Sequence, residues 1–358
     1  MRYRYIKKAD GSLVRSAQIW TAEEHNIAKS DVDPLAVYIC NKLSNEGYET
    51  YIVGGAVRDL LLKKVPKDFD IASAATPSRI KKIFNNSRII GKRFRLVHVF
   101  FGDKIFEIAT FRSMQNGASD NTFGKIEEDV MRRDFTMNAL FYDPQKEFVV
   151  DFVGGFEDIK NQRIKPLIPV STIFTEDPVR MLRAVKYAVI SGFSLPFALR
   201  QKIKKSASEL KRISPSRLTE EMGKILKSPH AAAIIEQFEE HGLYLYLQPK
   251  ASKLIRSSSN FRRRYFEAFA QINADGEEYA DAINGGLRAM IRDYIEDSVD
   301  WKKANEESYK SAFIMARKFI LPINPPRIEL SRAMRDIFAS HGLKIHRWRC
   351  LDRNRRGD

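Results

Sequence analysis

The pattern of apolar positions changes near residue 150. Before that point, short runs rich in Val, Ile, Phe and Tyr alternate with stretches of helical periodicity. Such runs, bounded by turn residues, are typical of strands. The strands predicted in this way span residues 51–53, 69–72, 96–101, 105–111 and 148–152. The helices predicted among them span residues 33–46, 56–62 and 77–84, the last with Thr76 as N-cap and Pro77 in its first turn.

After residue 155 the period is close to that of an α-helix almost throughout. Asp-Pro at 177–178 and Ser-Pro at 214–215 and 228–229 each predict a helix start, because a capping side chain precedes a proline that suits the first turn.

The pattern therefore predicts an α+β chain. We expect an α/β head over residues 1–155, with a small mixed, antiparallel-rich sheet and flanking helices. An all-α neck (156–225) and an all-α body with a basic tail (226–358) follow it. The polar segment 113–125 is expected to be a flexible loop.

The net charge of the chain indicates a class of binding partner. Lys and Arg number 61 against 45 Asp and Glu, which gives a net charge of +16 and favours binding to polyanions such as RNA. The basic residues gather in segments 200–227, 250–264 and 341–358, where Tyr265 and Trp348 could stack on unpaired bases. The alternative is a set of solvated helix faces with incidental aromatic residues.

Other classes are disfavoured. No apolar run approaches the length of about 20 residues that spans a bilayer, so we expect no membrane partner. The basic N-terminus lacks the apolar segment of a secretion signal. Cys40 and Cys350 lie in unrelated contexts and predict neither a disulfide framework nor a metal site, which fits a cytoplasmic location.

Candidate chemistry gathers in the segment 52–80. Gly54-Gly55 follows an apolar strand and opens a short helix, so backbone N–H groups could approach an anion closely. Asp68 and Asp70 are two apart and would project from one side of a strand, with Phe69 and Ile71 directed into the core. Two adjacent carboxylates repel unless a cation neutralises them, so we expect a site for Mg²⁺ or Mn²⁺. An exposed turn is the alternative explanation of the D-x-D pattern alone.

A third acid, Glu107, lies in the otherwise apolar run 105–111. Burying an unpaired carboxylate is costly, so Glu107 is expected to share the metals of Asp68 and Asp70, unless it is an edge residue that reaches solvent. Three such acids suit a two-metal reaction, in which one ion activates an RNA 3′-hydroxyl and the other holds a triphosphate and stabilises the leaving pyrophosphate. His98 is then structural or a nucleotide contact and is not needed as a base.

Four motifs in order, GGAVRD, DFDIA, EEDVMRRDFTMNAL and EDPVRMLRAVKYA, resemble those of the class II nucleotidyltransferases of the DNA polymerase β-like superfamily. That group contains bacterial poly(A) polymerases and CCA-adding tRNA nucleotidyltransferases. The resemblance runs from about residue 22 to about residue 240. RIIGKRFRLVHVFFG and TAEEHNIAKSDVDPLA resemble segments of the poly(A) polymerases. The chain ends sooner than typical poly(A) polymerases, which we expect to affect processivity and RNA affinity more than catalysis.

The resemblance implies a nucleotidyltransferase head and a role for each matched residue. Asp68, Asp70 and Glu107 would be the catalytic, metal-binding acids. The implied nucleotide-binding residues are Gly54, Gly55, Arg58, Arg133, Asp177, Arg180 and Arg183. Asp134 would be a further active-site acid, or would orient Arg133 through an ion pair.

The segment EDPVRMLRAVKYA also predicts a helix with Asp177 as N-cap and with Arg180 and Arg183 on one face. Its apolar side is expected to hold Val179, Leu182 and Val189. An acceptor and a donor one turn apart could bind the Watson–Crick edge of a base; the alternative is an ordinary surface ion pair.

The expected activity is the addition of AMP from ATP to RNA 3′ ends. CCA addition to tRNA from CTP and ATP is the alternative within the family. Outside it stand a catalytically inactive RNA-binding protein and a small-molecule adenylyltransferase. The latter would have little use for a basic helical half.

Overall fold

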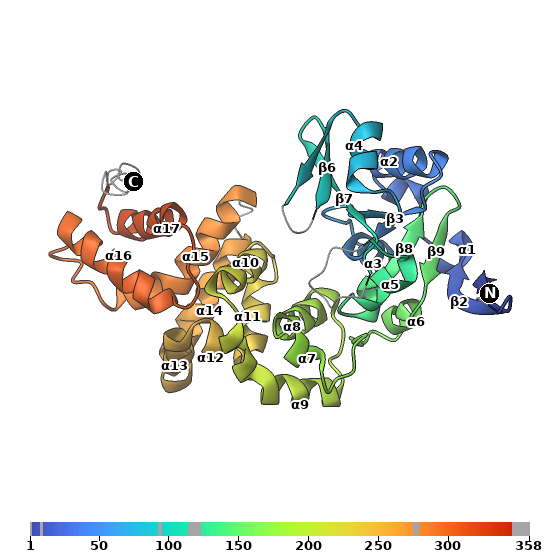
Figure 1. The fold of residues 1–358 in the computed structure, drawn as a ribbon. Coiled ribbons are helices and arrows are strands. Elements are labelled where there is room, and N and C mark those ends of the chain that lie inside the picture. The colour runs from blue at the N-terminus through green and yellow to red at the C-terminus, as the bar shows by residue number, and fades with distance from the viewer. Residues whose placement is uncertain (1, 8–9, 92–94, 114–122, 275–278, 346–358) are drawn as a thin grey trace. The chain divides into compact units, whose positions relative to one another are not determined.

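A computed structural model describes residues 2–7, 10–91, 95–113, 123–274 and 279–345 (Figure 1). The chain divides into two compact units. The first, here called the sheet unit, comprises residues 1–169 and 191–196. The second, the helical unit, comprises residues 170–190 and 197–358. Residues 156–169 of the predicted neck thus belong to the sheet unit.

The described part of the sheet unit contains one nine-stranded sheet in the order β1-β2-β9-β8-β3-β4-β7-β6-β5. The strands are β1 Arg2–Lys7, β2 Leu13–Trp20, β3 Thr50–Val53, β4 Ile71–Ser73, β5 Ser87–Ile90, β6 Leu96–Phe101, β7 Lys104–Thr110, β8 Leu140–Asp143 and β9 Phe148–Asp151. Neighbouring strands are antiparallel except for β4 and β7, which run parallel. The prediction of a mixed, antiparallel-rich sheet is confirmed.

The helices of this unit are α1 Ala22–His25, α2 Pro34–Asn45, α3 Gly55–Leu61, α4 Pro77–Ile83, α5 Ile126–Met131 and α6 Gly155–Lys160, with 3₁₀ helices at Lys29–Asp31 and Thr136–Asn138. Residue-level signals explain several starts. The Asp33 carboxylate accepts the Leu35 N–H at 2.8 Å and Pro34 occupies the first turn of α2. Thr76 is the N-cap of α4, as predicted.

Apolar side chains fill both faces of the sheet. Ile71, Val97 and Ile108 are fully buried, and α2 and α4 pack against the strands β3, β4 and β6. The other face has its own cluster, in which Val53, Ala72 and Phe141 lie with Ile126 and Val130 of α5. The alternation along β4 and β7 therefore separates two layers, and residues next to Ile71 and Ile108 in sequence lie on the α5 face.

The sequence missed β1, β2, β5 and β8. The first two are rich in basic and polar side chains and β1 is largely exposed, so the apolar signal is weak, although RYRYIK has the two-residue alternation of a strand. The predicted strand 69–72 is also corrected: β4 begins at Ile71, and Phe69 is only half-buried.

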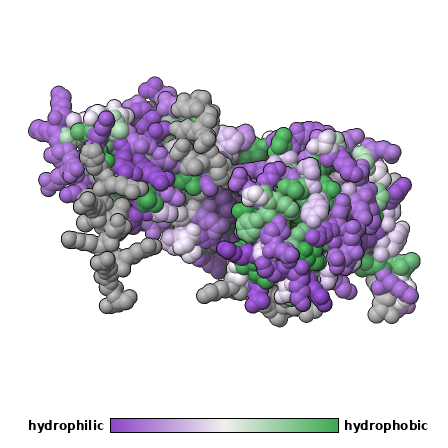
Figure 2. Space-filling model, turned by 90° about the horizontal axis from the view of Figure 1, so that it is seen from above, coloured by the Kyte–Doolittle hydropathy of each residue, from purple (hydrophilic) through white to green (hydrophobic). Residues whose placement is uncertain are grey.

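The helical unit contains α7 Ile173–Glu176, α8 Val179–Ser191, α9 Phe197–Ser206, a 3₁₀ helix Ala207–Arg212, α10 Pro215–Leu226, α11 Ala231–Glu240, α12 Tyr244–Leu247, α13 Pro249–Ser257, α14 Ser259–Ala274, α15 Tyr279–Glu296, α16 Glu306–Ile320 and α17 Arg327–Ser340. Ser214 caps α10 as predicted, its hydroxyl accepting the Arg217 N–H at 3.4 Å. The helix expected after 228–229 begins later, at Ala231. The visible face of this unit in Figure 2 is mainly hydrophilic.

One expectation about an aromatic residue needs correction, and some other predicted features lie outside the residues that the structure describes. Tyr265 cannot stack on RNA as it stands, because it is buried against Phe261 and Phe269 and its hydroxyl meets that of Tyr244 at 2.5 Å. Trp348, Cys350 and most of the loop 113–125 lie outside the described residues. Cys40 is buried and free. No helix among the described residues is both long and apolar enough to cross a membrane.

Candidate active site

The three predicted acids meet on the α5 face of the sheet. Asp68 and Asp70 directly precede β4, and the Asp70 carbonyl accepts the Val53 N–H of β3 at 2.9 Å. Glu107 lies in the middle of β7. Since Ile71 pairs with Ile108 in the parallel register, the preceding residues, Asp70 and Glu107, stand side by side on the opposite face.

The acids interact electrostatically. Crowding by protein atoms raises the pKa of Asp70 to about 6, and the negative charges of Glu107 and then Asp68 contribute to the rise, while Arg133 opposes it. Asp70 nevertheless keeps exposed surface, so ions from solvent can reach it. A carboxylate that is both crowded and repelled by two neighbours favours the binding of a cation.

Glu107 differs in one respect from the expectation. The argument from a buried, unpaired carboxylate was wrong, because 45% of the Glu107 side chain is exposed and its Oε2 lies 3.5 Å from His98 Nε2. The apolar run in which it lies is buried only at alternate positions, as on any strand with one covered face. His98 is directly opposite Glu107 in the β6–β7 register, so the row of polar groups continues across three strands.

The site is not a pre-formed metal cage. Within the described ranges, no three His, Cys, Asp or Glu side chains are grouped so that they could hold a metal ion by themselves. A divalent ion bound by these acids therefore needs further ligands, such as water or substrate phosphate oxygens, as is usual for Mg²⁺.

The Gly54-Gly55 step connects β3 to α3. Gly54 has φ 67° and ψ −122°, which a residue with a side chain rarely adopts. A Cβ atom here would lie 3.3 Å from Arg133 Nη1, so the glycine also leaves room for that guanidinium. A Cβ on Gly55 would lie 3.7 Å from Arg58 Nη2. Both predicted arginines therefore lie against the glycine step.

Arg133 is fixed by groups that the sequence analysis did not single out. Its Nη2 donates to Asp129 Oδ2 at 3.0 Å, its Nη1 donates to the Asn138 carbonyl at 3.0 Å, and it lies over the Phe141 ring. The expected alternative, an ion pair between Asp134 and Arg133, is thus not the arrangement observed. The i,i+4 spacing of Asp129 and Arg133 could have revealed the true partner.

Asp134 belongs to a second polar network. Its Oδ1 accepts the Asn138 side-chain amide at 3.1 Å, and the Asn138 oxygen in turn accepts Arg58 Nη1 at 2.9 Å. Arg58 also donates to Asp59 at 2.8 Å. Asp134, Asn138 and Arg58 are all buried. Asp134 therefore orients Arg58 through Asn138.

Two more arginines stand near these groups. Burial and the neighbouring charge of Arg132 lower the pKa of Arg112, while Asp129 and Glu107 act in the opposite direction. The Arg112 N–H also faces Asp129 Oδ1 at 3.4 Å. Arg112, Arg132 and Arg133 thus form a basic cluster close to Glu107, which suits an anionic substrate.

The remaining predicted residues lie in the helical unit, on and before α8. Asp177 Oδ1 accepts the Val179 N–H at 3.2 Å, so Asp177 has the predicted capping role. Its Oδ2 accepts Arg217 Nη2 at 2.7 Å, whereas Arg180 is buried and donates to Glu176 at 3.2 Å. Asp177 and Arg180 therefore have different partners and are not an ion pair with each other.

Arg183 donates to the Tyr187 hydroxyl at 3.0 Å. The predicted apolar side of α8 is only partly right: Val179 and Leu182 are buried, but Val189 is half-buried. Met181, Ala184, Val185 and Ala188 complete the buried side. Ala184 and Ala188, which are four residues apart, lie on the buried face of the helix, where Val189 was expected.

Known sequences and structures match these features. Residues 50–165 match the profile of the Poly A polymerase head domain, and residues 192–255 match that of the "probable RNA and SrmB-binding site of polymerase A". The first match contains the glycine step, the three acids and the Arg58 and Arg133 networks. The chain belongs to the poly(A) polymerase and CCA-adding enzyme family.

Members of this family under both names are similar to the chain. Poly(A) polymerase I of Salmonella typhi is 40% identical over 247 residues, which are 64% of this chain and 53% of the relative. The CCA-adding enzyme of Geobacillus kaustophilus is 35% identical over 235 residues, 63% of this chain and 58% of the relative. The chain therefore spans little more than half the length of these relatives.

A solved structure of the family has the same fold. The Bacillus stearothermophilus CCA-adding enzyme in complex with CTP aligns with a TM-score of 0.58 and 28% identity, over 86% of this chain and 83% of that one. The prediction of the family and of its α+β fold is confirmed.

Proposed function

We propose that the chain is a template-independent RNA polymerase that adds AMP from ATP to RNA 3′ ends and releases pyrophosphate. The observation on which the proposal rests is the convergence of Asp68, Asp70 and Glu107 on one face of the sheet, where burial, and after it the charges of Glu107 and Asp68, raises the pKa of Asp70 to about 6. A cluster of mutually repelling carboxylates beside a basic cluster suits the joint binding of a divalent ion and a triphosphate. Family membership supports the same chemistry.

In this proposal Asp68, Asp70 and Glu107 bind Mg²⁺ or Mn²⁺. The raised pKa of Asp70 supports this role, because the positive charge of such an ion would relieve the repulsion among the three acids. When bound, divalent ions lower the pKa of a 3′-hydroxyl and stabilise the leaving pyrophosphate.

The glycine step and its arginines are proposed to hold the triphosphate. Gly54 and Gly55 offer close backbone approach, while Arg133 supplies charge from the position that Asp129 and Asn138 fix. Arg58 contributes charge from beneath the step, and Asp134 positions it through Asn138. None of these residues needs to act as a general base.

Asp177, Arg180 and Arg183 are proposed to select the base. The Asp177 carboxylate is an acceptor that a base amine could share with Arg217, and Arg183 is a donor within the same helix start. The polymerase would take RNA as its second substrate, and the match to an RNA-binding profile over residues 192–255 supports this. Such an activity fits the cytoplasmic location expected from the sequence.

A second candidate is CCA addition to tRNA. The relative of Geobacillus kaustophilus and the CTP-bound structure are named for that activity, and both reactions use the same chemistry. The relatives named poly(A) polymerase I match 64–69% of the chain at 37–41% identity, against 59–63% at 35–38% for the CCA-adding enzymes, and this supports polyadenylation.

The test gives purified protein ATP with a generic single-stranded RNA, and separately CTP plus ATP with a tRNA that lacks its 3′ end. Long A-tails in the first reaction support the proposal. Restoration of CCA in the second reaction, without tailing in the first, would overturn it in favour of the alternative. Lack of incorporation in either, with both Mg²⁺ and Mn²⁺ supplied, would leave only an RNA-binding role.

A further inference from the structure

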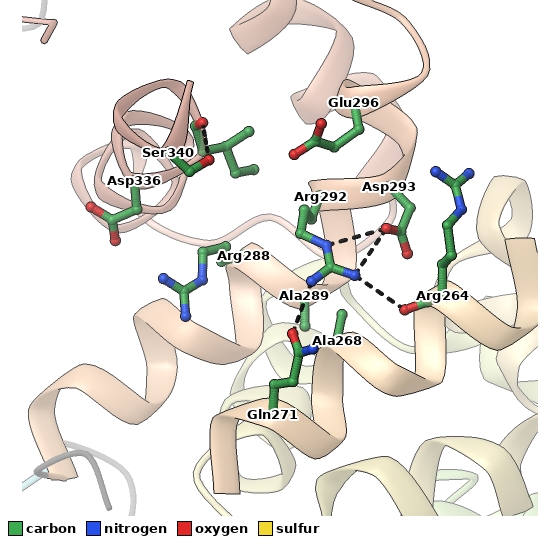
Figure 3. Close-up of a pocket in the computed structure, with 11 residues that line it drawn as sticks. Arg264, Ala268, Gln271, Arg288, Ala289, Arg292, Asp293, Glu296, Asp336 and Ser340 are labelled. Carbon is green, nitrogen blue, oxygen red and sulfur yellow. Dashed lines mark hydrogen bonds and ion pairs between the residues drawn. The ribbon is translucent and has the colours of Figure 1, made fainter. Parts of the chain in front are cut away.

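The helical unit contains a pocket of about 470 Å³ between α14, α15 and α17 (Figure 3). Its volume is within the range of about 300–1,000 Å³ that is usual for small-ligand sites. It lies C-terminal to the segment that matches the RNA-binding profile. Its wall is mostly charged and polar. The properties of three of its side chains together indicate which kind of ligand the pocket would bind.

The first is Arg292, whose guanidinium is held in one orientation. Its Nε and Nη2 donate to Asp293 Oδ1 at 3.2 and 3.1 Å, its Nη1 to Gln271 Oε1 at 3.2 Å and its Nη2 to the Arg264 carbonyl at 3.3 Å. Ala268 and Ala289 line the pocket next to it and leave space. A fixed, planar guanidinium beside small side chains suits stacking with a nucleobase.

The second is Asp293, which is 2% exposed. Its Oδ1 is occupied by Arg292, but its Oδ2 is buried without any hydrogen-bond partner among the residues that the structure describes. Leaving a buried acceptor unsatisfied costs about 1–3 kcal/mol, so native proteins rarely do so without a reason. Burial also raises the pKa of Asp293, although the charge of Arg292 opposes the rise. A ligand with an N–H donor would satisfy Oδ2.

The third is Arg288, which is not paired with any acid among the described residues. In the described ranges it makes neither an ion pair nor a hydrogen bond, and Figure 3 shows it directed away from Arg292 along the same wall. By contrast Arg264 is paired with Asp297, and Glu296 with His341 at 2.9 Å. Arg288 is therefore free to bind an anionic group such as a phosphate.

We propose that this pocket binds one nucleotide with an amino-bearing base: the phosphate on Arg288, the base against Arg292, and the base amine donating to Asp293 Oδ2. A nucleotide combines a planar ring, an exocyclic donor and an anion, one group for each of these three residues. The expected source is an unpaired residue of the RNA, which rests on the proposed function. A free mononucleotide has the same chemistry.

The first test measures binding of labelled oligoadenylate to the full chain by fluorescence anisotropy, without triphosphate. Arg288→Gln should weaken binding about tenfold and reduce the slope of log affinity against log salt by about 0.7, the value of one phosphate contact on a single strand. The control is Arg327→Gln on α17, which removes the same charge from an exposed arginine outside the pocket. Equal effects of the two substitutions would overturn the proposal.

The second test inverts the hydrogen-bonding group. In Asp293→Asn the amide oxygen is needed by Arg292, so the amide N–H₂ would face the pocket and a donor would replace the acceptor. The ratio of affinities for oligoadenylate and oligouridylate should fall about tenfold or reverse, because uracil offers a carbonyl where adenine offers an amine. An unchanged ratio in folded protein, checked by circular dichroism, would contradict the assignment. Should Asp293→Asn fail to fold, Arg288→Gln remains decisive.

Titration with AMP distinguishes the two sources. If AMP binds wild type more tightly than Arg288→Gln, and if it displaces oligoadenylate from wild type, the pocket takes free nucleotide as well as RNA. If only the oligonucleotide distinguishes the variants, the ligand is an RNA residue. None of these readouts needs nucleotide incorporation, so failure of the polymerase proposal is detected separately.

Discussion

The acids near the candidate metal site of the sheet unit differ in their surroundings from the acids at the start of α8 in the helical unit. In the sheet unit the charges that raise the pKa of Asp70 are those of Glu107 and Asp68. In the helical unit Asp177 is paired with Arg217 at 2.7 Å and Glu176 with Arg180 at 3.2 Å. The acids beside β4 and on β7 gather like charges, whereas those at the start of α8 are each paired with an arginine.

The sheet unit also contains a buried carboxylate whose two oxygens are both hydrogen-bonded. Asp151, at the end of β9, is 1% exposed, and its two oxygens accept the backbone N–H groups of residues 153–156 at 2.8–3.0 Å. The uncompensated state of Asp70 is thus a local feature of one face. The difference supports the proposal that the acids near β4 and β7 bind a cation from outside the chain.

The largest effect is expected from removing one of these acids. Asp68→Ala and Asp70→Ala should each lower nucleotide incorporation by about 10³-fold or more, since a lost metal ligand removes several kcal/mol of transition-state stabilisation. Retention of RNA in a filter assay should change little. The matched control is Asp103→Ala, an exposed acid in the turn between β6 and β7. A variant at Asp70 that keeps a tenth of wild-type activity would contradict the role.

The next prediction distinguishes the effect of an added Cβ atom close to Arg133 from the effect of backbone strain at a glycine. Gly54→Ala should lower kcat/KM for ATP about 10–10²-fold, because its Cβ would press on Arg133 Nη1 at 3.3 Å. Gly47→Ala is the control: Gly47 also has a positive φ, 86°, but nothing lies within 4 Å of the added atom. Gly47→Ala should therefore cost about 1 kcal/mol of stability and leave kinetics unchanged. Similar kinetics for the two variants would show that the contact with Arg133 does not matter.

A smaller effect tests whether the neutralised acids of the helical unit have a role beyond stability. Asp177→Asn should change the ratio of ATP to CTP incorporation about tenfold, because a base-reading acceptor becomes a donor. Arg217→Gln breaks the same ion pair but keeps the carboxylate, so the ratio should move less. If both variants lose stability and neither changes the ratio, the Asp177–Arg217 pair is structural only.

The smallest effect concerns stability and pH in the absence of divalent ions. Asp70 has a folded pKa of about 6 against 3.8 for the ordinary group, so the folded state holds its proton more tightly. Its contribution to stability is therefore greatest below about pH 4 and is lost as pH rises through 6. Allowing for solvent screening of this exposed group, the loss is about 1 kcal/mol.

Asp70→Asn removes that loss. Its thermal midpoint should exceed that of wild type by roughly 2–4 °C at pH 7 and by less at pH 4. Calorimetry at both pH values, with EDTA present, measures the difference. Adding Mg²⁺ should stabilise wild type more than the variant. A difference between the proteins that does not change with pH would argue against a raised pKa.

Much of the fold followed from local patterns in the sequence. The caps predicted at Thr76 and Ser214 set two helix starts correctly, because each depends on neighbours in the chain. Strand β6 was predicted to the residue from its run of Val and Phe. Strands β1 and β2 were missed because their stability comes from pairing with each other and with β9, which composition does not record.

The site was only partly accessible from the sequence. The acids could be named from their motifs, but the neighbourhood of Asp70 and Glu107 depends on a parallel pairing across more than 30 residues of chain. The exposure of Glu107 and the partners of Arg133 and Asp177 depend on tertiary contacts. Asp129 and Asn138 lay within a recognised motif, yet their roles appear only when Arg133 and Arg58 are placed.

The central claim is that Asp70 and Glu107 share one electrostatic site, and a carboxylate titration tests it most directly. Wild type, Glu107→Gln and Asp70→Asn, each with ¹³C-labelled aspartate and no divalent ion, would be titrated by NMR, with Asp70→Asn identifying the Asp70 signal. The pKa of Asp70 should be about 6 in wild type and clearly lower in Glu107→Gln. An ordinary pKa in wild type, or one that Glu107→Gln leaves unchanged, would contradict the shared site.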